Sequence, residues 1–155
     1  MSFVKQQYLD FENVLSYRTR VDINRLNAIL KFDGSNADAF GLEVTGNVLF
    51  TVFETVKDKN KCILGIEILI PVNQAFESCE QYVYKPEFRL VNAVSTRFYG
   101  SYSEIDSINN SLMDYLKTNN MNAISNIYYV AIQNFEDSPF NSILDAYVSV
   151  NENLL

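Results

Sequence analysis

The chain of 155 residues contains no histidine and no tryptophan, and only two cysteines, five glycines and three prolines. Without histidine, Ser-His and Cys-His nucleophilic systems are excluded, and the commonest general base near neutral pH is missing. Two cysteines alone cannot complete a tetrahedral zinc site of the usual Cys/His type. No glycine stands in a GxGxxG or GxxxxGK[ST] pattern. We therefore expect no catalytic residues of these kinds, no metal and no cofactor.

Long hydrophobic runs are also missing. No run approaches the roughly 18 apolar residues of a membrane span, and residues 1–7 lack the apolar stretch of a signal peptide. We expect no membrane contact, a cytoplasmic location, and free thiols at Cys62 and Cys79.

Basic residues are few: 12 Lys and Arg stand against 19 Asp and Glu, which gives a net charge of −7. Because the basic residues are scattered, direct binding of nucleic acid is disfavoured. A DNA mimic remains open, although moderate acidity usually serves solubility. The hydrophobic fraction of 48% and charged fraction of 20% are typical of a globular protein, and the length suits a single domain over 1–155.

A weak internal repeat divides this domain. Residues 47–54 resemble residues 126–133, and residues 63–70 resemble residues 143–150. Both pairs are offset by about 80 residues, which is half the chain. We expect two similar halves, about 10–72 and 87–151, joined by a linker at 73–86.

Each half predicts the order strand, helix, strand, strand. In the first half, Asp22 caps a helix with apolar residues every three or four positions; in the second, Ser103 caps a helix with an apolar stripe from Ile105 to Leu116. β-Forming residues and polar turns predict the strands, at 13–21, 47–56 and 61–70, then 89–99, 126–134 and 142–150.

Residues 96–105 (TRFYGSYSEI), which run into residues 112–116 (LMDYL), resemble the strand, glycine turn and helix of GyrI-like proteins. That family includes effector-binding domains of multidrug-responsive transcription activators and a stand-alone gyrase inhibitor. The likeness covers about residues 10–151. It implies an α+β fold of two βαββ halves with pseudo-twofold symmetry, in which an antiparallel sheet carries both helices on one face and a ligand groove on the other.

Strand alternation indicates which residues face that groove. Glu67 lies on the opposite strand face from Ile66 and Ile68, and the repeat aligns it with Tyr147, two residues after Asp145. Glu67 begins a stretch that ends in Pro-Val, as the family's acid does. The family places its key acid in the second half, so this sequence departs from that pattern. The candidate ligand-binding residues are Glu67, Asp145, Tyr147, Tyr128, Tyr99, Tyr82, Tyr84 and Phe88.

A carboxylate among aromatic rings suits an apolar or cationic ligand. We therefore expect a stand-alone, non-catalytic module that binds a small molecule. A protein-binding accessory or inhibitor, similar to the gyrase inhibitor or associated with a secretion system, is the alternative. A hydrolase with a single buried carboxylate is also open. Each candidate has a structural alternative, because carboxylates on strands are often solvated and tyrosines often only pack.

Overall fold

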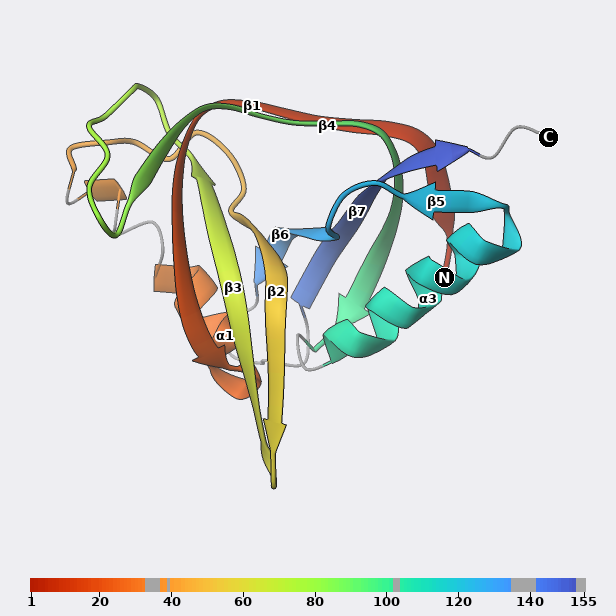
Figure 1. Cartoon of the computed structure of the whole chain (residues 1–155). Helices are drawn as coiled ribbons and strands as arrows, with labels where there is room; N and C mark the ends of the chain where they lie inside the picture. The colour runs from red at the N-terminus through yellow and green to blue at the C-terminus, as the bar shows by residue number, and fades with distance from the viewer. Residues whose placement is uncertain (33–36, 39, 102–103, 135–141, 153–155) are drawn as a thin grey trace.

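The computed structural model describes residues 1–32, 37–38, 40–101, 104–134 and 142–152. The elements follow the predicted duplicated order (Figure 1). They are β1 (Phe3–Asp22), η1 (Ile23–Arg25), α1 (Leu26–Phe32), β2 (Leu49–Asp58), β3 (Lys61–Pro71), β4 (Val83–Gly100), α3 (Ile105–Thr118), β5 (Met121–Ala123), β6 (Tyr128–Asn134) and β7 (Ser142–Glu152).

The seven strands form one antiparallel sheet in the order β4-β1-β3-β2-β6-β7-β5. An additional pairing of β4 with β7 closes six of these strands into a ring, and β5 extends β7. In Figure 1, β1 and β4 run together along the top as an arch, and each then descends into its own half. Two ladders of the ring therefore join the halves: the long ladder between β1 and β4, and the short ladder between β2 and β6.

The halves are related by a pseudo-twofold axis that passes between Phe50 and Tyr129. These two residues are the central pair of the short ladder between β2 and β6, and their rings stack at 5.2 Å. An irregularity in β2 between Val52 and Glu54 corresponds to one in β6 between Ala131 and Gln133. The duplication predicted from the sequence is therefore present in the strand registers as well as in the element order.

Two asparagines in left-handed backbone conformation lie at related positions of the long strands. Asn13 in β1 has φ 57° and Asn92 in β4 has φ 49°. Asparagine tolerates this region better than most residues that carry a side chain. Because Asn13 interrupts the alternation, Phe11 and Val14 pack in the same hydrophobic cluster although they are three residues apart. The local reversal redirects side chains where each strand passes from one half to the other.

The main core lies between the sheet and the helices. Residues on the strand face opposite Glu67 and Tyr147 are buried there, among them Ile66, Ile68, Ala146 and Val148. The predicted stripe of α3 is confirmed, since its buried residues are Ile105, Ile108, Leu112 and Leu116.

Some boundaries differ from the prediction. Asp22 does cap the first helical turn, where its Oδ1 accepts a hydrogen bond from the Asn24 backbone N–H at 2.9 Å. Ser103 lies outside the described residues, and Glu104, at the N-cap position of α3, makes no side-chain capping bond. β4 begins at Val83, inside the predicted linker, because residues 83–85 pair with residues 14–16 of β1 and the ladder continues beyond Pro86.

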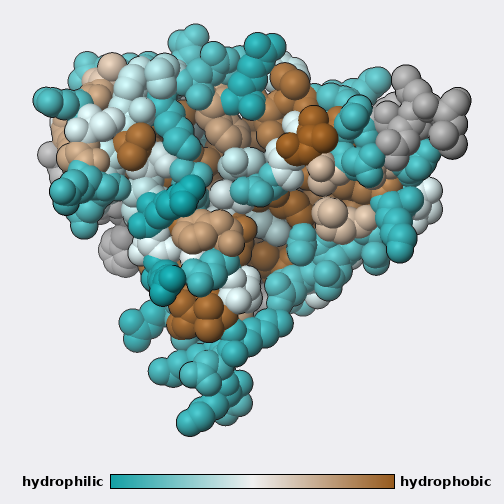
Figure 2. All heavy atoms as spheres, in the orientation of Figure 1, coloured by the Kyte–Doolittle hydropathy of each residue, from teal (hydrophilic) through white to brown (hydrophobic). Residues whose placement is uncertain are grey.

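The β2–β3 hairpin projects from the sheet and ends in the turn predicted at residues 57–60. Its tip is hydrophilic, and apolar residues form separate patches among polar ones on the face seen in Figure 2. Within the described ranges, no helix has the length and apolar character needed to cross a membrane.

Candidate functional site

The sheet face opposite the helices carries a second, smaller hydrophobic cluster. Its buried members are Val14, Leu49, Leu69 and Val130. Partly buried side chains pack over them: Leu9, Phe11, Phe88, Tyr128, Ile132 and Tyr147. The predicted groove face is therefore occupied along its middle by side chains from both halves.

Glu67 and Asp145 occupy structurally related positions on this face. Glu67 pairs with Arg18 of β1 and Thr51 of β2, whereas Asp145 pairs with Arg97 of β4 and Val130 of β6. Arg18 and Arg97 correspond under the pseudo-twofold, and so do Thr51 and Val130. The registers thus relate Glu67 to Asp145, two residues before the Tyr147 that the sequence repeat aligned with it.

Both carboxylate oxygens of Asp145 accept hydrogen bonds from a residue of the same half of the molecule. Arg97 donates two hydrogen bonds to it, from Nε to Oδ1 at 2.8 Å and from the guanidinium to Oδ2 at 2.9 Å. This two-pronged pair raises the pKa of Arg97, and the Tyr99 hydroxyl contributes to the same shift. The Asp145 side chain is only 14% exposed. The second acid is therefore held in an internal ion pair.

Glu67 forms hydrogen bonds with a different set of partners. Its Oε2 accepts a hydrogen bond from Ser16 Oγ at 2.7 Å and from Lys85 Nζ at 2.9 Å, and its side chain is 13% exposed. Burial tends to raise the pKa of Glu67, but the bonds from Lys85 and Ser16 and the charges of Lys85 and Arg18 outweigh burial, so its pKa is lowered. The carboxylate is stabilised in its charged form.

Arg18, the counterpart of Arg97, does not form the same pair. Its guanidinium lies 5.0 Å from the centre of the Phe53 ring. Phe53 in turn lies against Gly65, where an added Cβ would come within 2.8 Å of the ring. Gly65 therefore lets Phe53 fold onto the sheet and support Arg18 beside Glu67.

The structure brings together five of the predicted residues, the two acids and three aromatic side chains between them. Tyr128 and Tyr147 are directly paired on β6 and β7, and the Phe88 ring meets Tyr128 edge-on at 4.8 Å. Burial and the charge of Glu67 raise the pKa of Tyr128. Burial and the charge of Asp145 raise the pKa of Tyr147, which Arg97 partly offsets. Glu67, Tyr128, Phe88, Tyr147 and Asp145 thus form a continuous row across the face.

The other three predicted residues lie outside this row. Tyr99 is 68% exposed near the end of β4. Tyr82 packs edge-on against Tyr17 at 5.3 Å, and Tyr84 packs against Phe76 and donates its hydroxyl to Asn13 Oδ1 at 2.6 Å. Tyr82 and Tyr84 therefore belong to an aromatic cluster at the outer edge of the first half.

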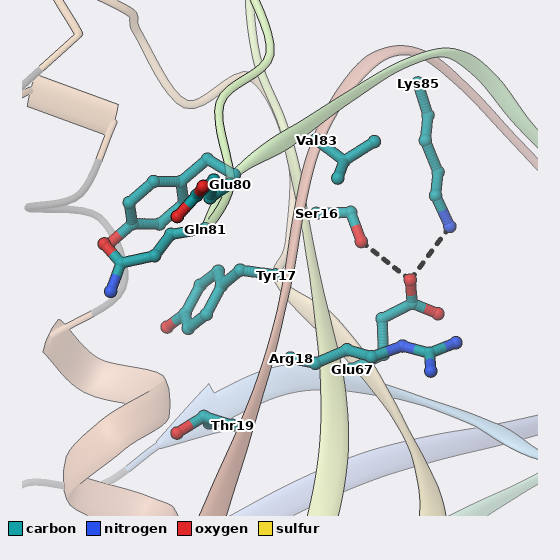
Figure 3. Close-up of a pocket in the computed structure, with 10 residues that line it drawn as sticks. Ser16, Tyr17, Arg18, Thr19, Glu67, Glu80, Gln81, Val83 and Lys85 are labelled. Carbon is teal, nitrogen blue, oxygen red and sulfur yellow. Dashed lines mark hydrogen bonds and ion pairs between the residues drawn. The ribbon is translucent and has the colours of Figure 1, made fainter.

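A cavity of about 660 Å³ opens beside Glu67 where β4 leaves β1. The β1–β4 ladder ends at the pair Ser16 and Val83, whereas β1 continues along β3 to Asp22. Figure 3 shows the cavity on both sides of β1, with Ser16, Arg18, Glu67 and Lys85 converging on one side and Tyr17, Thr19, Glu80 and Gln81 on the other. Tyr82 and Val83 complete the lining.

The predicted ligand-binding residues did not include Ser16, Arg18 or Lys85, which line this cavity. Ser16 and Arg18 share a strand face, which alternation along β1 indicates, but only the register places that face beside Glu67. Lys85 carried no signal, because the sequence placed it in a linker.

No family model matches the chain, and no curated protein matches it. Solved structures do match. The C-terminal domain of EcmrR aligns with 99% of this chain and all of its own length, at a TM-score of 0.65 and 16% identity. In the EcmrR–DNA complex, the match has a TM-score of 0.67 and 15% identity, and the chain spans 58% of EcmrR. A hydrolase from Listeria innocua aligns over 97% of this chain and 91% of its own, at a TM-score of 0.62 and 13% identity.

These identities are low, so the likeness shows the fold alone. The chain has the α+β fold of the EcmrR C-terminal domain, which is the GyrI-like fold that the sequence predicted.

Proposed function

We propose that this protein is a non-catalytic small-molecule-binding module whose ligand occupies the cavity beside Glu67. The observation that carries the proposal is the cavity itself, about 660 Å³ in volume, with a charged cluster on one side and aromatic rings on the other. Ligand pockets for drug-sized molecules have roughly 300–1,000 Å³ and combine apolar walls with a few convergent polar groups. The sequence resemblance to effector-binding domains points to the same function.

The ligand we propose has an apolar, aromatic body. Tyr17 and Tyr82 offer ring surfaces in one part of the cavity. A cationic group on the ligand would reach Glu67 by displacing the Lys85 ammonium, which binds the same carboxylate. Glu67 then acts as the exchangeable anion of the site, and Lys85 covers it when no cation is bound.

The electrostatics of Glu67 support a binding role over a hydrolytic one. A carboxylate that activates water near neutral pH needs a raised pKa. Lys85 and Ser16 instead hold the pKa of Glu67 below its usual value, after outweighing the opposite effect of burial. Such a group remains a charged contact rather than a proton acceptor.

Native mass spectrometry of protein purified gently from its own host tests the proposal. We expect the wild-type protein to retain a small molecule that denaturation releases, and Glu67→Gln and Tyr82→Ala to retain less of it. Asp145→Asn is the matched control, because it changes the related acid of the other half, which does not line the cavity. Equal retention by wild type and Glu67→Gln, or no retained molecule at all, would contradict the proposal.

Protein binding by strand addition is the second candidate, and one observation favours it. Past Ser16, β1 pairs with β3 on one side while its ladder with β4 has ended, so within the described ranges the outer edge of residues 18–22 pairs with no strand. The same mass spectrum distinguishes the candidates, since a retained protein without a small molecule would favour this edge.

A further inference from the structure

A second cavity, of about 250 Å³, lies on the helix-covered face of the sheet, between the first turns of α3, the strands β2 and β3, and β6. Figure 1 shows the N-terminal end of α3 approaching β2 at this place, and Lys57 of β2 pairs with Asp106 of α3 at 3.2 Å. The cavity shares no lining residue with the one beside Glu67.

Tyr129 is the buried polar residue of this second cavity. It is 3% exposed, and in the described part of the chain its hydroxyl has no hydrogen-bond partner. Burial, together with the charge of Asp106 nearby, raises the pKa of Tyr129, so the hydroxyl keeps its proton and can donate it. A buried hydroxyl without a partner costs free energy, and such groups are uncommon in folded proteins.

The fold does not require this hydroxyl. The residue related to Tyr129 by the pseudo-twofold is Phe50, which is 0% exposed and stacks on the Tyr129 ring across the axis. An aromatic ring satisfies the packing in the first half without any polar atom. The hydroxyl in the second half is therefore an addition to what packing needs, and Tyr129 is one of the residues that line the cavity.

The remaining lining defines the chemistry of an occupant. Five of the ten described lining residues are aliphatic, and four polar ones are exposed and so lie at the rim. Among the described lining residues, Asp106 is the only charged one, and Lys57 already pairs with it. The rim also offers the carboxamides of Asn109 and Asn126. The aliphatic residues are Ile23, Val52, Leu64, Ile105 and Ile127.

We infer that this cavity is a second binding site, for a compact, uncharged, planar molecule that carries a hydrogen-bond acceptor for the Tyr129 hydroxyl. The volume lies below the usual range for drug-sized ligands, which restricts the occupant to roughly a single ring with a small polar substituent. Neutral carboxamides at the rim and an ion-paired Asp106 favour a neutral amide or heterocycle over an ion.

Nicotinamide and nicotinate provide a matched pair of probes, since they share a shape and differ in charge. By ligand-observed NMR we expect wild-type protein to bind nicotinamide with a Kd on the order of 1 mM, and nicotinate several-fold more weakly, because its carboxylate would lose hydration on entering the cavity. Tyr129→Phe should weaken nicotinamide binding by about fivefold or more, through loss of one hydrogen bond. Glu67→Gln is the control and should bind nicotinamide as wild type does, which separates this site from the proposed function.

Thermal unfolding without any ligand supplies an independent readout. Tyr129→Phe should be as stable as wild type or melt at a higher temperature, because it removes an unpartnered buried hydroxyl. Asn126→Ala, at the exposed rim, should weaken nicotinamide binding without changing the melting temperature. No nicotinamide binding, equal binding by Tyr129→Phe, equal binding of nicotinate, or a marked drop in the melting temperature of Tyr129→Phe would each overturn the inference.

Discussion

Glu67 and Asp145 occupy related positions in the two halves, yet each carboxylate is satisfied by a different kind of partner. Asp145 is held by the guanidinium of its cross-strand neighbour Arg97, whereas Glu67 takes a hydroxyl and an ammonium from Ser16 and Lys85. An ammonium on a flexible side chain is a point charge and exchanges partners more readily than a two-pronged guanidinium pair. This difference is why we place the ligand site at Glu67.

The acid stability of the protein should depend on Glu67. Its folded-state pKa lies below the usual 4.5, so the stabilisation it supplies is present above that pH and is lost as the pH falls through the lowered value. Glu67→Gln should therefore lose less unfolding free energy than wild type between about pH 6 and about pH 3, measured by urea denaturation.

Glu77→Gln is the control for this pH dependence, because Glu77 is exposed and makes no ion pair within the described ranges. It should follow the wild-type curve. Identical acid profiles for wild type and Glu67→Gln would show that the contacts from Lys85 and Ser16 do not stabilise the charged carboxylate.

The sequence predicted the acids and tyrosines of the groove face but not their partners. Alternation along a strand is enough to place Glu67, Asp145 and Tyr147 on one face. It does not reveal which residue of a neighbouring strand lies opposite, and the similarity of residues 63–70 to residues 143–150 aligned Glu67 with Tyr147 instead of Asp145. Tyr84 pairs with Leu15 near the start of β4, and Tyr82 precedes that strand, so both lie in the edge cluster and not in the row of tyrosines.

At the scale of elements, the long strands depend on residues that leave the usual β conformation. Asn92 combines a left-handed backbone with a hydrogen bond from its Nδ2 to the Val150 carbonyl at 3.0 Å. Its counterpart Asn13 accepts the Tyr84 hydroxyl. Both asparagines use a side-chain bond to stabilise the place where strand alternation reverses. The sequence predicted strands there but neither reversal, since an isolated asparagine inside a strand has no specific pattern.

Alanine and glycine at position 92 should reverse their usual order of stability. Both lose the side-chain bond, but alanine in the left-handed region costs about 1–2 kcal/mol that glycine does not. Asn92→Ala should therefore unfold at lower urea concentration than Asn92→Gly. At exposed Val91, which has an ordinary strand φ, the alanine variant should be the more stable of the two. The same order at both positions would contradict the role given to Asn92.

At the scale of the whole molecule, duplication produces a ring of strands whose two halves differ where they could bind. In the first half, a cavity opens where β4 departs from β1. In the second half, the aromatic side chain next to the pseudo-twofold axis is Tyr129, which carries a hydroxyl that its counterpart Phe50 lacks. Fold and helix faces were predictable from the sequence because they repeat. The cavities were not, because each arises from a local departure from the repeat.

Amide chemical-shift mapping shows whether the ligand lies beside Glu67. The molecule released from the native protein is titrated into ligand-free protein, and shifts are recorded for every assigned amide. We expect the largest changes at residues 16–19, at Glu67 and at residues 80–85, with little change at α3 or around Asp145. Changes confined to the Tyr129 cavity or to the Asp145 side, with none at Glu67, would contradict it.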